Sequence, residues 1–135
     1  RDYIFGYTIL NDVSARDVQT AHKQWYFGKS LDGFTPIGPC IVTADAFADY
    51  PPRLGIRSFV NGEKRQDSNT ALQIFDIDHV IAELSQGMTL KAGTIIATGT
   101  PAGVGMGMDP PQFLKPGDVV RCEIDGIGTL TNPVK

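Results

Sequence analysis

The sequence lacks long apolar runs and clustered positive charge. No stretch of its 135 residues approaches the roughly 20 apolar residues of a membrane-spanning helix. Its 12 Lys and Arg stand against 15 Asp and Glu, which argues against nucleic acid or an anionic membrane as the main partner. The first residues also lack the basic-then-apolar order of a signal peptide. We therefore expect a cytoplasmic protein with a small-molecule substrate and neither a nucleic-acid nor a membrane partner.

Cysteine and histidine are too sparse to indicate a redox, zinc or nucleophile site. Cys40 and Cys122 have no C-x-x-C spacing and are interpreted as buried free thiols. His22 and His79 lack the spacing of zinc ligands and are interpreted as structural or solvated. No G-x-S-x-G elbow occurs, so covalent nucleophilic catalysis is not expected. The string "FGKS" lacks the earlier glycine of a phosphate-binding loop, which excludes a P-loop.

The composition, with 41% hydrophobic and 20% charged residues, is typical of one soluble domain, and we expect residues 1–135 to form a single domain. The first residue is Arg1 and not Met, and a strand pattern has begun by Tyr3. We therefore expect the chain to be the C-terminal portion of a longer protein.

Aromatic and β-branched residues between turn signals predict a β-rich chain. Strands are expected over 3–10, 40–44 and 94–100. Asn-Gly and Asp-Gly dipeptides favour the positive φ of tight turns, which predicts two hairpins. These hairpins are expected over 55–66, turning at Asn61-Gly62, and over 118–130, turning at Asp125-Gly126. The count is five to eight strands.

Two helices complete the expected α+β fold. The first is expected over 14–23, where Ser14 and Asp17 match a capping box that satisfies free backbone amides. The second is expected over 77–84, with apolar residues at helical spacing and Asp76 as its N-cap.

Three polar residues gather where the first strand leads into the first helix. Asp12 lies at the carboxyl end of the strand, and Arg16 and Gln19 are three positions apart on one helix face. These side chains are able to line one pocket. The alternative is that Asp12 only helps to cap the helix while Arg16 and Gln19 are solvated.

Two further polar residues lie in glycine-containing loops. Lys29, within the long ordered loop 24–39, is either a fixed positive charge for an anionic ligand or an exposed surface lysine. Thr100 begins the string "TPAGVG" after Gly99, where glycines let a backbone approach a ligand. As a bare pattern this is weak, because most glycine-rich turns are only turns.

Four blocks, in this order, resemble the catalytic domain of the fumarylacetoacetate hydrolase family. They are "GYTILNDVSARDVQ", "FGKSLDGFTPIGP", "LSQGMTLKAGTIIATGTPAGVG" and "LKPGDVVRCEIDGIGTLTNPV", and together they cover nearly the whole chain. The resemblance implies a β-rich fold of mixed sheets rolled into a sandwich-like barrel with two short helices. It also implies a homodimer that binds Mg²⁺ or Mn²⁺ through three carboxylates.

The resemblance assigns roles to the same polar residues. Asp12 matches the third metal ligand, and Arg16 and Gln19 match residues that orient substrate and water. Lys29 matches a lysine that contacts the oxygens of a 2-oxo acid. Thr100 matches a threonine at the carboxylate or enolate end of the substrate.

Two parts of the family pattern are missing from these residues. The other two metal ligands form a Glu-x-Glu pair upstream in the family, and no Glu-x-Glu occurs in the sequence. The histidine–glutamate pair that activates water also comes from an upstream lid, and neither His22 nor His79 matches it. In addition, Thr94 stands where many relatives carry Asp, which we interpret as a structural variation.

The expected activity is metal-dependent hydrolysis of a C–C bond in acylpyruvate- or fumarylacetoacetate-like 2-oxo acids. Such cleavage passes through an enolate, which a cation and a lysine stabilise. Isomerisation of a hydroxymuconate and decarboxylation of an oxaloacetate-like acid pass through the same species and remain alternatives. A catalytically inactive binding domain is a third, because a lone carboxylate holds Mg²⁺ weakly in water.

Overall fold

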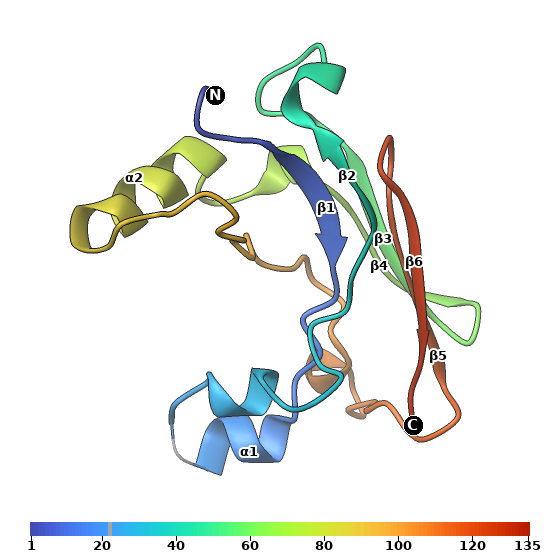
Figure 1. Ribbon diagram of the computed structural model, residues 1–135. Coiled ribbons are helices and arrows are strands. Elements are labelled where there is room, and N and C mark those ends of the chain that lie inside the picture. Colours follow the sequence, from blue (N-terminus) through green and yellow to red (C-terminus); the bar gives the residue numbers. More distant parts are fainter. Residues whose placement is uncertain (22) are drawn as a thin grey trace.

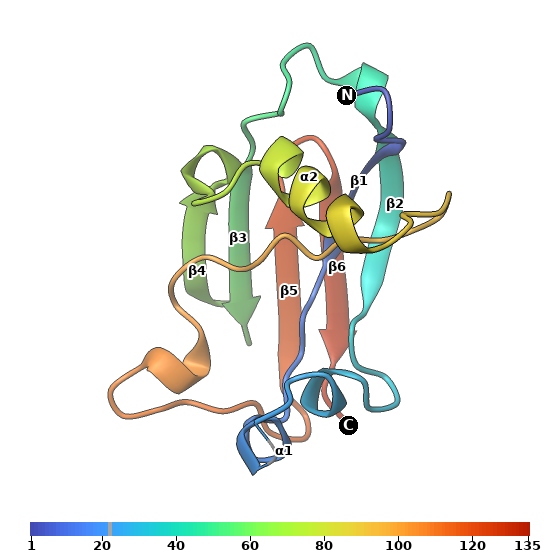
Figure 2. The same ribbon diagram turned by 90° about the vertical axis from the view of Figure 1, so that its left-hand side faces the viewer.

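A computed structural model describes residues 1–21 and 23–135 of the chain. It contains a two-stranded sheet, β1-β2, and a four-stranded sheet of order β4-β3-β5-β6, in which every pairing is antiparallel (Figures 1 and 2). The strands are β1 (Gly6–Leu10), β2 (Ile37–Thr43), β3 (Gly55–Val60), β4 (Glu63–Asn69), β5 (Val119–Ile124) and β6 (Gly128–Pro133). The α-helices are α1 (Arg16–Ala21) and α2 (Ile77–Gly87). The expected β-rich α+β class is confirmed, although neither sheet closes into a barrel within the described ranges.

Both expected hairpins are present. Asn61 and Gly62 have φ angles of 51° and 84°, which only an asparagine or glycine adopts readily, and they join β3 to β4. The turn between β5 and β6 contains Asp125 and Gly126 as expected, and it extends to Ile127, whose N–H donates to Ile124 O at 3.0 Å.

The β3–β4 hairpin contains a bulge beside the hollow face of the sheet. Phe59 pairs with Lys64, but the next pair along is Ser58 with Gln66, so Arg65 is an extra residue in β4. A bulge breaks the alternation of side chains between the two faces. As a result, Arg65 and Gln66 both line the same hollow.

The apolar core of the chain is small. The β1–β2 ribbon packs against β5 and β6, and the buried hydrophobic residues are Ile9, Val120 and Ile127. The chain has an accessible surface of 9355 Å², against about 6900 Å² for a folded monomer of its mass. Large apolar side chains are exposed, for example Phe5 at 74% and Ile74 at 91%. Much apolar surface is therefore available for further contacts.

Helix α2 begins as the sequence predicts. The Asp76 carboxylate accepts a hydrogen bond from His79 N at 2.8 Å. The Tyr50 hydroxyl donates to the carboxylate of Asp78, which ties the helix to the segment before β3. Burial, followed by this contact with Asp78, raises the pKa of Tyr50 to about 12. His79 stacks on Phe75, with 4.7 Å between ring centroids, which fits its structural interpretation.

The structure corrects the first predicted helix. Helix α1 begins at Arg16, two residues later than expected, and the capping box does not form. Instead, the Ser14 hydroxyl donates to Asp12 O at 3.2 Å and accepts from Lys29 Nζ at 3.0 Å. Asp17 accepts from the adjacent Val18 N. Lys29, from a distant segment, competes for the capping hydroxyl. The interpretation of His22 lies outside the described residues.

Two other predictions are wrong. Residues 94–100 form no strand: they pair with no strand among residues 1–21 and 23–135, and the segment crosses in front of the larger sheet (Figure 2). Both cysteines are free as expected, but Cys40 is exposed and Cys122 is half-buried. Across the described part of the chain, no helix has the length and apolar character needed to cross a membrane.

Asn61 joins the β3–β4 turn to the start of β5. Its Nδ2 donates to Asp118 Oδ1 at 2.8 Å, and its Oδ1 accepts from Val119 N at 2.9 Å. The hydrogen bond from Asn61, and then that from Lys115 N, holds the pKa of Asp118 below its usual value of 3.8. This stabilisation is fully present above pH 3.8 and is lost as the pH falls through the lowered pKa.

We expect Asn61→Gly in the full-length protein to raise the pKa of Asp118 toward its usual value. Glycine accepts the positive φ of the turn, so the substitution isolates the loss of the side-chain hydrogen bonds. The pKa is measured by NMR titration of the Asp118 carboxyl group. Because the stabilisation is lost in the variant, its urea midpoint should fall less than that of the wild type between pH 7 and pH 3. An unchanged pKa would contradict the assignment.

Candidate active site

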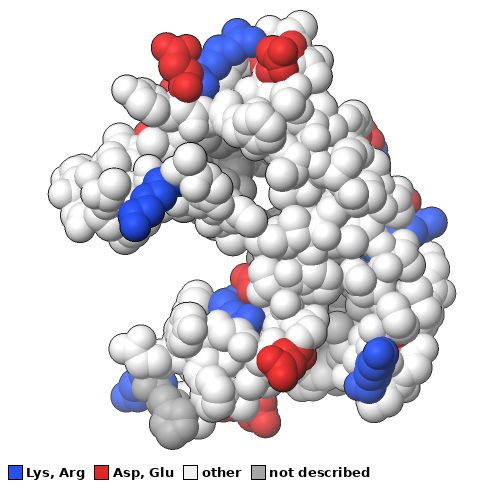
Figure 3. Space-filling view, in the orientation of Figure 1, with Lys and Arg blue, Asp and Glu red and all other residues white. Residues whose placement is uncertain are grey.

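The chain has a large open hollow on the inner face of the four-stranded sheet. Figure 3 shows a deep notch in the surface between α1 and α2, and the hollow lies on the α1 side of it, since none of its lining residues belongs to α2. The hollow has a volume of about 1490 Å³ and is lined by the Asn11–Asp17 segment, by β3, β5 and β6, and by residues 103–118. Its wall carries two buried polar atoms, Arg65 Nε and Asn132 Oδ1, that have no hydrogen-bond partner in the described structure.

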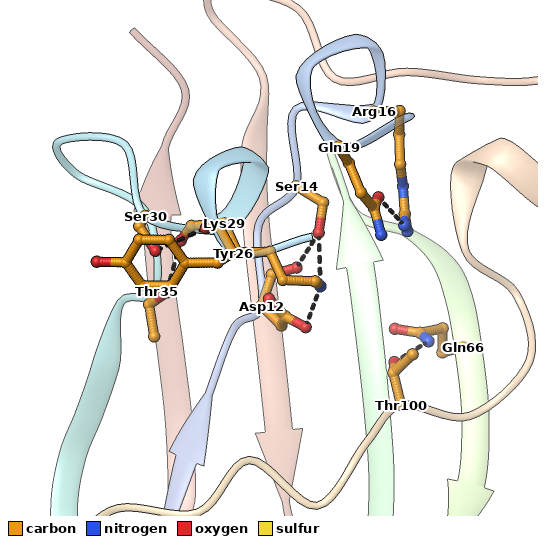
Figure 4. A network of polar contacts seen from close by, with 10 residues as sticks. All are labelled: Asp12, Ser14, Arg16, Gln19, Tyr26, Lys29, Ser30, Thr35, Gln66 and Thr100. Atoms are coloured by element: carbon orange, nitrogen blue, oxygen red, sulfur yellow. Dashed lines mark hydrogen bonds and ion pairs between the residues drawn. The ribbon is translucent and has the colours of Figure 1, made fainter. Parts of the chain in front are cut away.

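Asp12, Ser14 and Lys29 form a charged cluster at the edge of this hollow (Figure 4). Lys29 Nζ lies 2.5 Å from Asp12 Oδ2 and 3.0 Å from Ser14 Oγ. The Lys29 side chain is 25% exposed and that of Asp12 is 41% exposed. Lys29 is therefore paired and only partly exposed.

The position of Lys29 depends on the close contact between Gly28 and α1. Gly28 O accepts a hydrogen bond from Ala15 N at 2.8 Å. A Cβ at Gly28 would lie 2.8 Å from Gln19 N and 2.9 Å from Ala15 O, both of which are backbone atoms. Only glycine lets the 3₁₀ turn Phe27–Lys29 lie this close to the helix. The turn then directs Lys29 toward Asp12.

Arg16 and Gln19 lie on one face of α1, as their spacing predicts. The Arg16 guanidinium donates to Gln19 Oε1 at 2.8 Å. Arg16 lines the hollow, whereas Gln19 is buried, with 4% of its surface exposed. The buried amide oxygen of Gln19 therefore holds the Arg16 guanidinium in one orientation. Arg16 has further N–H donors for a ligand.

Thr100 is held from β4 and does not contact the charged cluster directly. Gln66 Nε2 donates to Thr100 Oγ1 and to Pro101 O, each at 2.8 Å. Gly103, with φ of 105°, packs on the Arg65 carbonyl, where a Cβ would lie at 2.1 Å. Because Gly103 has no side chain, this segment is able to pack directly on the backbone of β4. Figure 4 shows Asp12–Lys29, Arg16–Gln19 and Gln66–Thr100 as three separate groups.

The metal-ligand chemistry is only partly present in this chain. Asp12 supplies a hard oxygen donor of the kind that Mg²⁺ and Mn²⁺ prefer. Among residues 1–21 and 23–135, no group of three or more His, Cys, Asp and Glu is placed to hold a metal ion. Asp12 is therefore a single hard oxygen donor and not, with the other described residues, a complete metal site.

Comparison with known proteins identifies the family. Residues 1–135 match the fumarylacetoacetate (FAA) hydrolase C-terminal family. The chain belongs to the fumarylacetoacetate hydrolase family. Its structure is similar to a fumarylacetoacetate hydrolase of Exiguobacterium antarcticum, with a TM-score of 0.95 and 55% identity over 99% of this chain and 48% of that one. The expected family and its fold type are thus confirmed.

Other relatives of this family bear different activity names. The chain is 52% identical over 133 residues to the oxaloacetate tautomerase YisK of Bacillus subtilis, covering 98% of this chain and 44% of that protein. It is 48% identical to a 2-hydroxyhepta-2,4-diene-1,7-dioate isomerase of Mycobacterium marinum, with a TM-score of 0.85, covering 98% of this chain and 48% of that one. The chain thus spans less than half the length of these relatives.

Two residues of the site were not identified from the sequence. The sequence predicts that Ser14 caps a helix, yet its hydroxyl contacts Lys29. No sequence pattern indicates Gln66, yet its amide donates to Thr100. The hairpin at Asn61-Gly62 is the signal closest to Gln66, but a regular register from that turn would pair Ser58 with Arg65. The bulge that brings Gln66 opposite Ser58 has no clear sequence signature.

Gly28→Ala in the full-length protein should separate the 27–29 turn from α1. The added Cβ meets only backbone atoms of Gln19 and Ala15, which cannot rotate away. We expect a loss of about 1–3 kcal/mol in the free energy of unfolding, the usual cost of overpacking. Urea unfolding measures this loss.

Gly87→Ala is the matched control for that substitution. Gly87 ends α2, and a Cβ there meets nothing within 4 Å. The control should be neutral or slightly stabilising, because alanine is the better helix former. Equal stability of the two variants would show that the close contact at Gly28 is unimportant.

Proposed function

We propose that the full-length protein is a divalent-metal-dependent enzyme that converts 2-oxo acids through an enolate. The observation that carries this proposal is the cluster in which Asp12 and Lys29 place a carboxylate and an ammonium 2.5 Å apart at the edge of the hollow. A small oxo acid would occupy only part of this hollow, since typical small-molecule sites have roughly 300–1000 Å³.

The residues of this chain bind and orient such a substrate. The Lys29 ammonium is fixed by Asp12 and Ser14, so it is already in place when negative charge develops on an enolate oxygen. The Arg16 guanidinium, oriented by Gln19, is suited to a substrate carboxylate through its remaining donors. None of these residues is proposed as the base that removes the substrate proton.

Asp12 would hold the cation, Mg²⁺ or Mn²⁺, together with carboxylates from outside the described residues. The bound ion supplies electrostatic stabilisation of a deprotonated 2-oxo acid. In the present structure Asp12 Oδ2 is paired with the Lys29 ammonium, which supports placing a cation beside this carboxylate.

Keto–enol tautomerisation of an oxaloacetate-like acid is the first candidate reaction. The name of the tautomerase YisK supports it, at 52% identity. C–C bond hydrolysis of an acylpyruvate or fumarylacetoacetate, the activity expected from the family resemblance, is the second candidate, and the name of the Exiguobacterium relative supports it, at 55% identity. Both reactions need the same enolate, and hydrolysis additionally needs an activated water. Decarboxylation of oxaloacetate remains a third use of the site.

Asp12→Asn in the full-length enzyme should weaken Mn²⁺ binding by at least about tenfold, because a ligand loses its charge. It should also abolish turnover of enol-oxaloacetate or of an acylpyruvate. Electron paramagnetic resonance measures free Mn²⁺, and the change in ultraviolet absorbance of the enol measures turnover. Mn²⁺ binding equal to that of the wild type would refute the assignment of Asp12.

Lys29→Met separates the role of the lysine from that of the metal ligand. This variant should retain Mn²⁺ binding, since it leaves the Asp12 carboxylate unchanged. Its kcat/KM should fall by at least about tenfold, the scale of one lost charge-assisted contact. Unchanged turnover would show that Lys29 serves only to pair Asp12.

The full-length protein is further proposed to act in the cytoplasm as a homodimer. Support comes from the exposed apolar side chains, including Phe5 and Ile74, since such surface favours association. Sedimentation velocity of the full-length protein should give one species of twice the chain mass at micromolar concentration. A single species of monomer mass would exclude the dimer.

A further inference from the structure

Gln66 has three hydrogen-bond partners on two different segments. Its Oε1 accepts from the hydroxyl of Ser58 on β3 at 2.7 Å. Its Nε2 donates to Thr100 Oγ1 and to Pro101 O, both at 2.8 Å. The bulge in β4 directs the side chain to this position, at the wall of the hollow. The amide therefore links two strands of the sheet to the glycine-rich segment.

The orientation of this amide follows from its partners. The Pro101 carbonyl oxygen only accepts hydrogen bonds, so the atom facing it is the amide nitrogen. The amide oxygen must then face Ser58, which donates to it. An amide nitrogen has two hydrogens, and these are directed to Pro101 O and to Thr100 Oγ1.

This orientation determines the role of the Thr100 hydroxyl. Because Gln66 Nε2 has no lone pair to offer, Thr100 Oγ1 acts as the acceptor in their contact. The single hydrogen of the hydroxyl is therefore directed away from Gln66. Thr100 is exposed, so a ligand oxygen is able to approach its hydroxyl and receive that hydrogen.

We propose that Gln66 is a positioning residue that makes Thr100 an obligate hydrogen-bond donor to a carboxylate or enolate oxygen of the bound 2-oxo acid. The relay runs from Ser58 through Gln66 to Thr100, and each step fixes the direction of the next (Figure 4 shows its last link). The inference rests on the proposed function, since the ligand is the 2-oxo acid of that site. Gln66 itself contacts no substrate, but it determines that the Thr100 hydroxyl donates to the substrate and does not accept from it.

Gln66→Glu replaces the amide that donates to Thr100 with a carboxylate that only accepts hydrogen bonds. The introduced carboxylate accepts from both Ser58 and Thr100, so the Thr100 hydrogen turns inward and is lost to the ligand. We expect the Kd of oxalate, an unreactive planar mimic of an enolised oxo acid, to rise by about tenfold or more at pH 8 in the full-length, Mg²⁺-loaded enzyme. The KM of the oxo acid should rise in parallel, with a smaller change in kcat.

The pH dependence of the oxalate Kd distinguishes control of the Thr100 hydrogen-bond direction from a purely structural role of Gln66. As the pH is lowered from 8 toward 5, the introduced carboxyl group begins to regain a proton, given an ordinary pKa of about 4.3. It then donates again, so the penalty in Kd relative to the wild type should shrink. Gln86→Glu is the matched control on the exposed face of α2, and it should show neither the penalty nor the pH dependence.

Two further variants keep the test valid if Gln66→Glu is poorly folded. Gln66→Met retains the side-chain length and removes the amide, so it should give a smaller rise in Kd that does not depend on pH. In a double-mutant cycle, Thr100→Val removes the hydroxyl, and Gln66→Glu added to it should cause little further loss. Calorimetry measures each Kd, and circular dichroism reports the folded state.

The possible outcomes separate this inference from the proposed function. If the wild type binds oxalate and Gln66→Glu binds it equally well at pH 8, the positioning role is overturned while the enzyme proposal stands. Additive losses in the double-mutant cycle would likewise overturn it, because Gln66 would not then act through Thr100. If the wild type binds no oxalate and converts no 2-oxo acid, both proposals fail.

Discussion

The close packing of the 27–29 turn on α1 is the constraint on which the charged cluster depends. Gly28 lies against the backbone of Ala15 and Gln19, at distances that leave no space for a side chain. This contact brings Lys29 beside Asp12, 17 positions earlier in the chain. An attractive ion pair alone would not hold a flexible lysine in one place, since half-exposed pairs contribute little stability. The backbone contact fixes the 27–29 turn on α1, and the ion pair orients the Lys29 side chain toward Asp12.

A second constraint comes from the bulge in β4. It turns two consecutive side chains to the same face of the sheet, and each of them contacts the glycine-rich segment between Thr100 and Gln112. Gly103 permits this segment to approach the Arg65 carbonyl. The loop lacks regular pairing but is tied to the sheet at several points. Functional loops held by a rigid scaffold have this character.

The chain has a small apolar core and a large exposed apolar surface. With Ile9, Val120 and Ile127 as its buried hydrophobic residues, the chain buries less apolar surface than is usual for its size. Helix α2 has an apolar face, yet none of its residues is buried. Both observations fit a chain that spans less than half the length of its relatives.

The sequence by itself determined the features that depend on near neighbours. These are the turns at Asn61-Gly62 and Asp125-Gly126, the Asp76 cap of α2, and the family with its motif residues, because short patterns encode them. Only the tertiary structure decided the bulge at Arg65, the failure of 94–100 to pair, and the transfer of Ser14 from cap to Lys29 partner. Each of these results from competition between groups far apart in the chain, and local propensity carries no record of which distant partner is present.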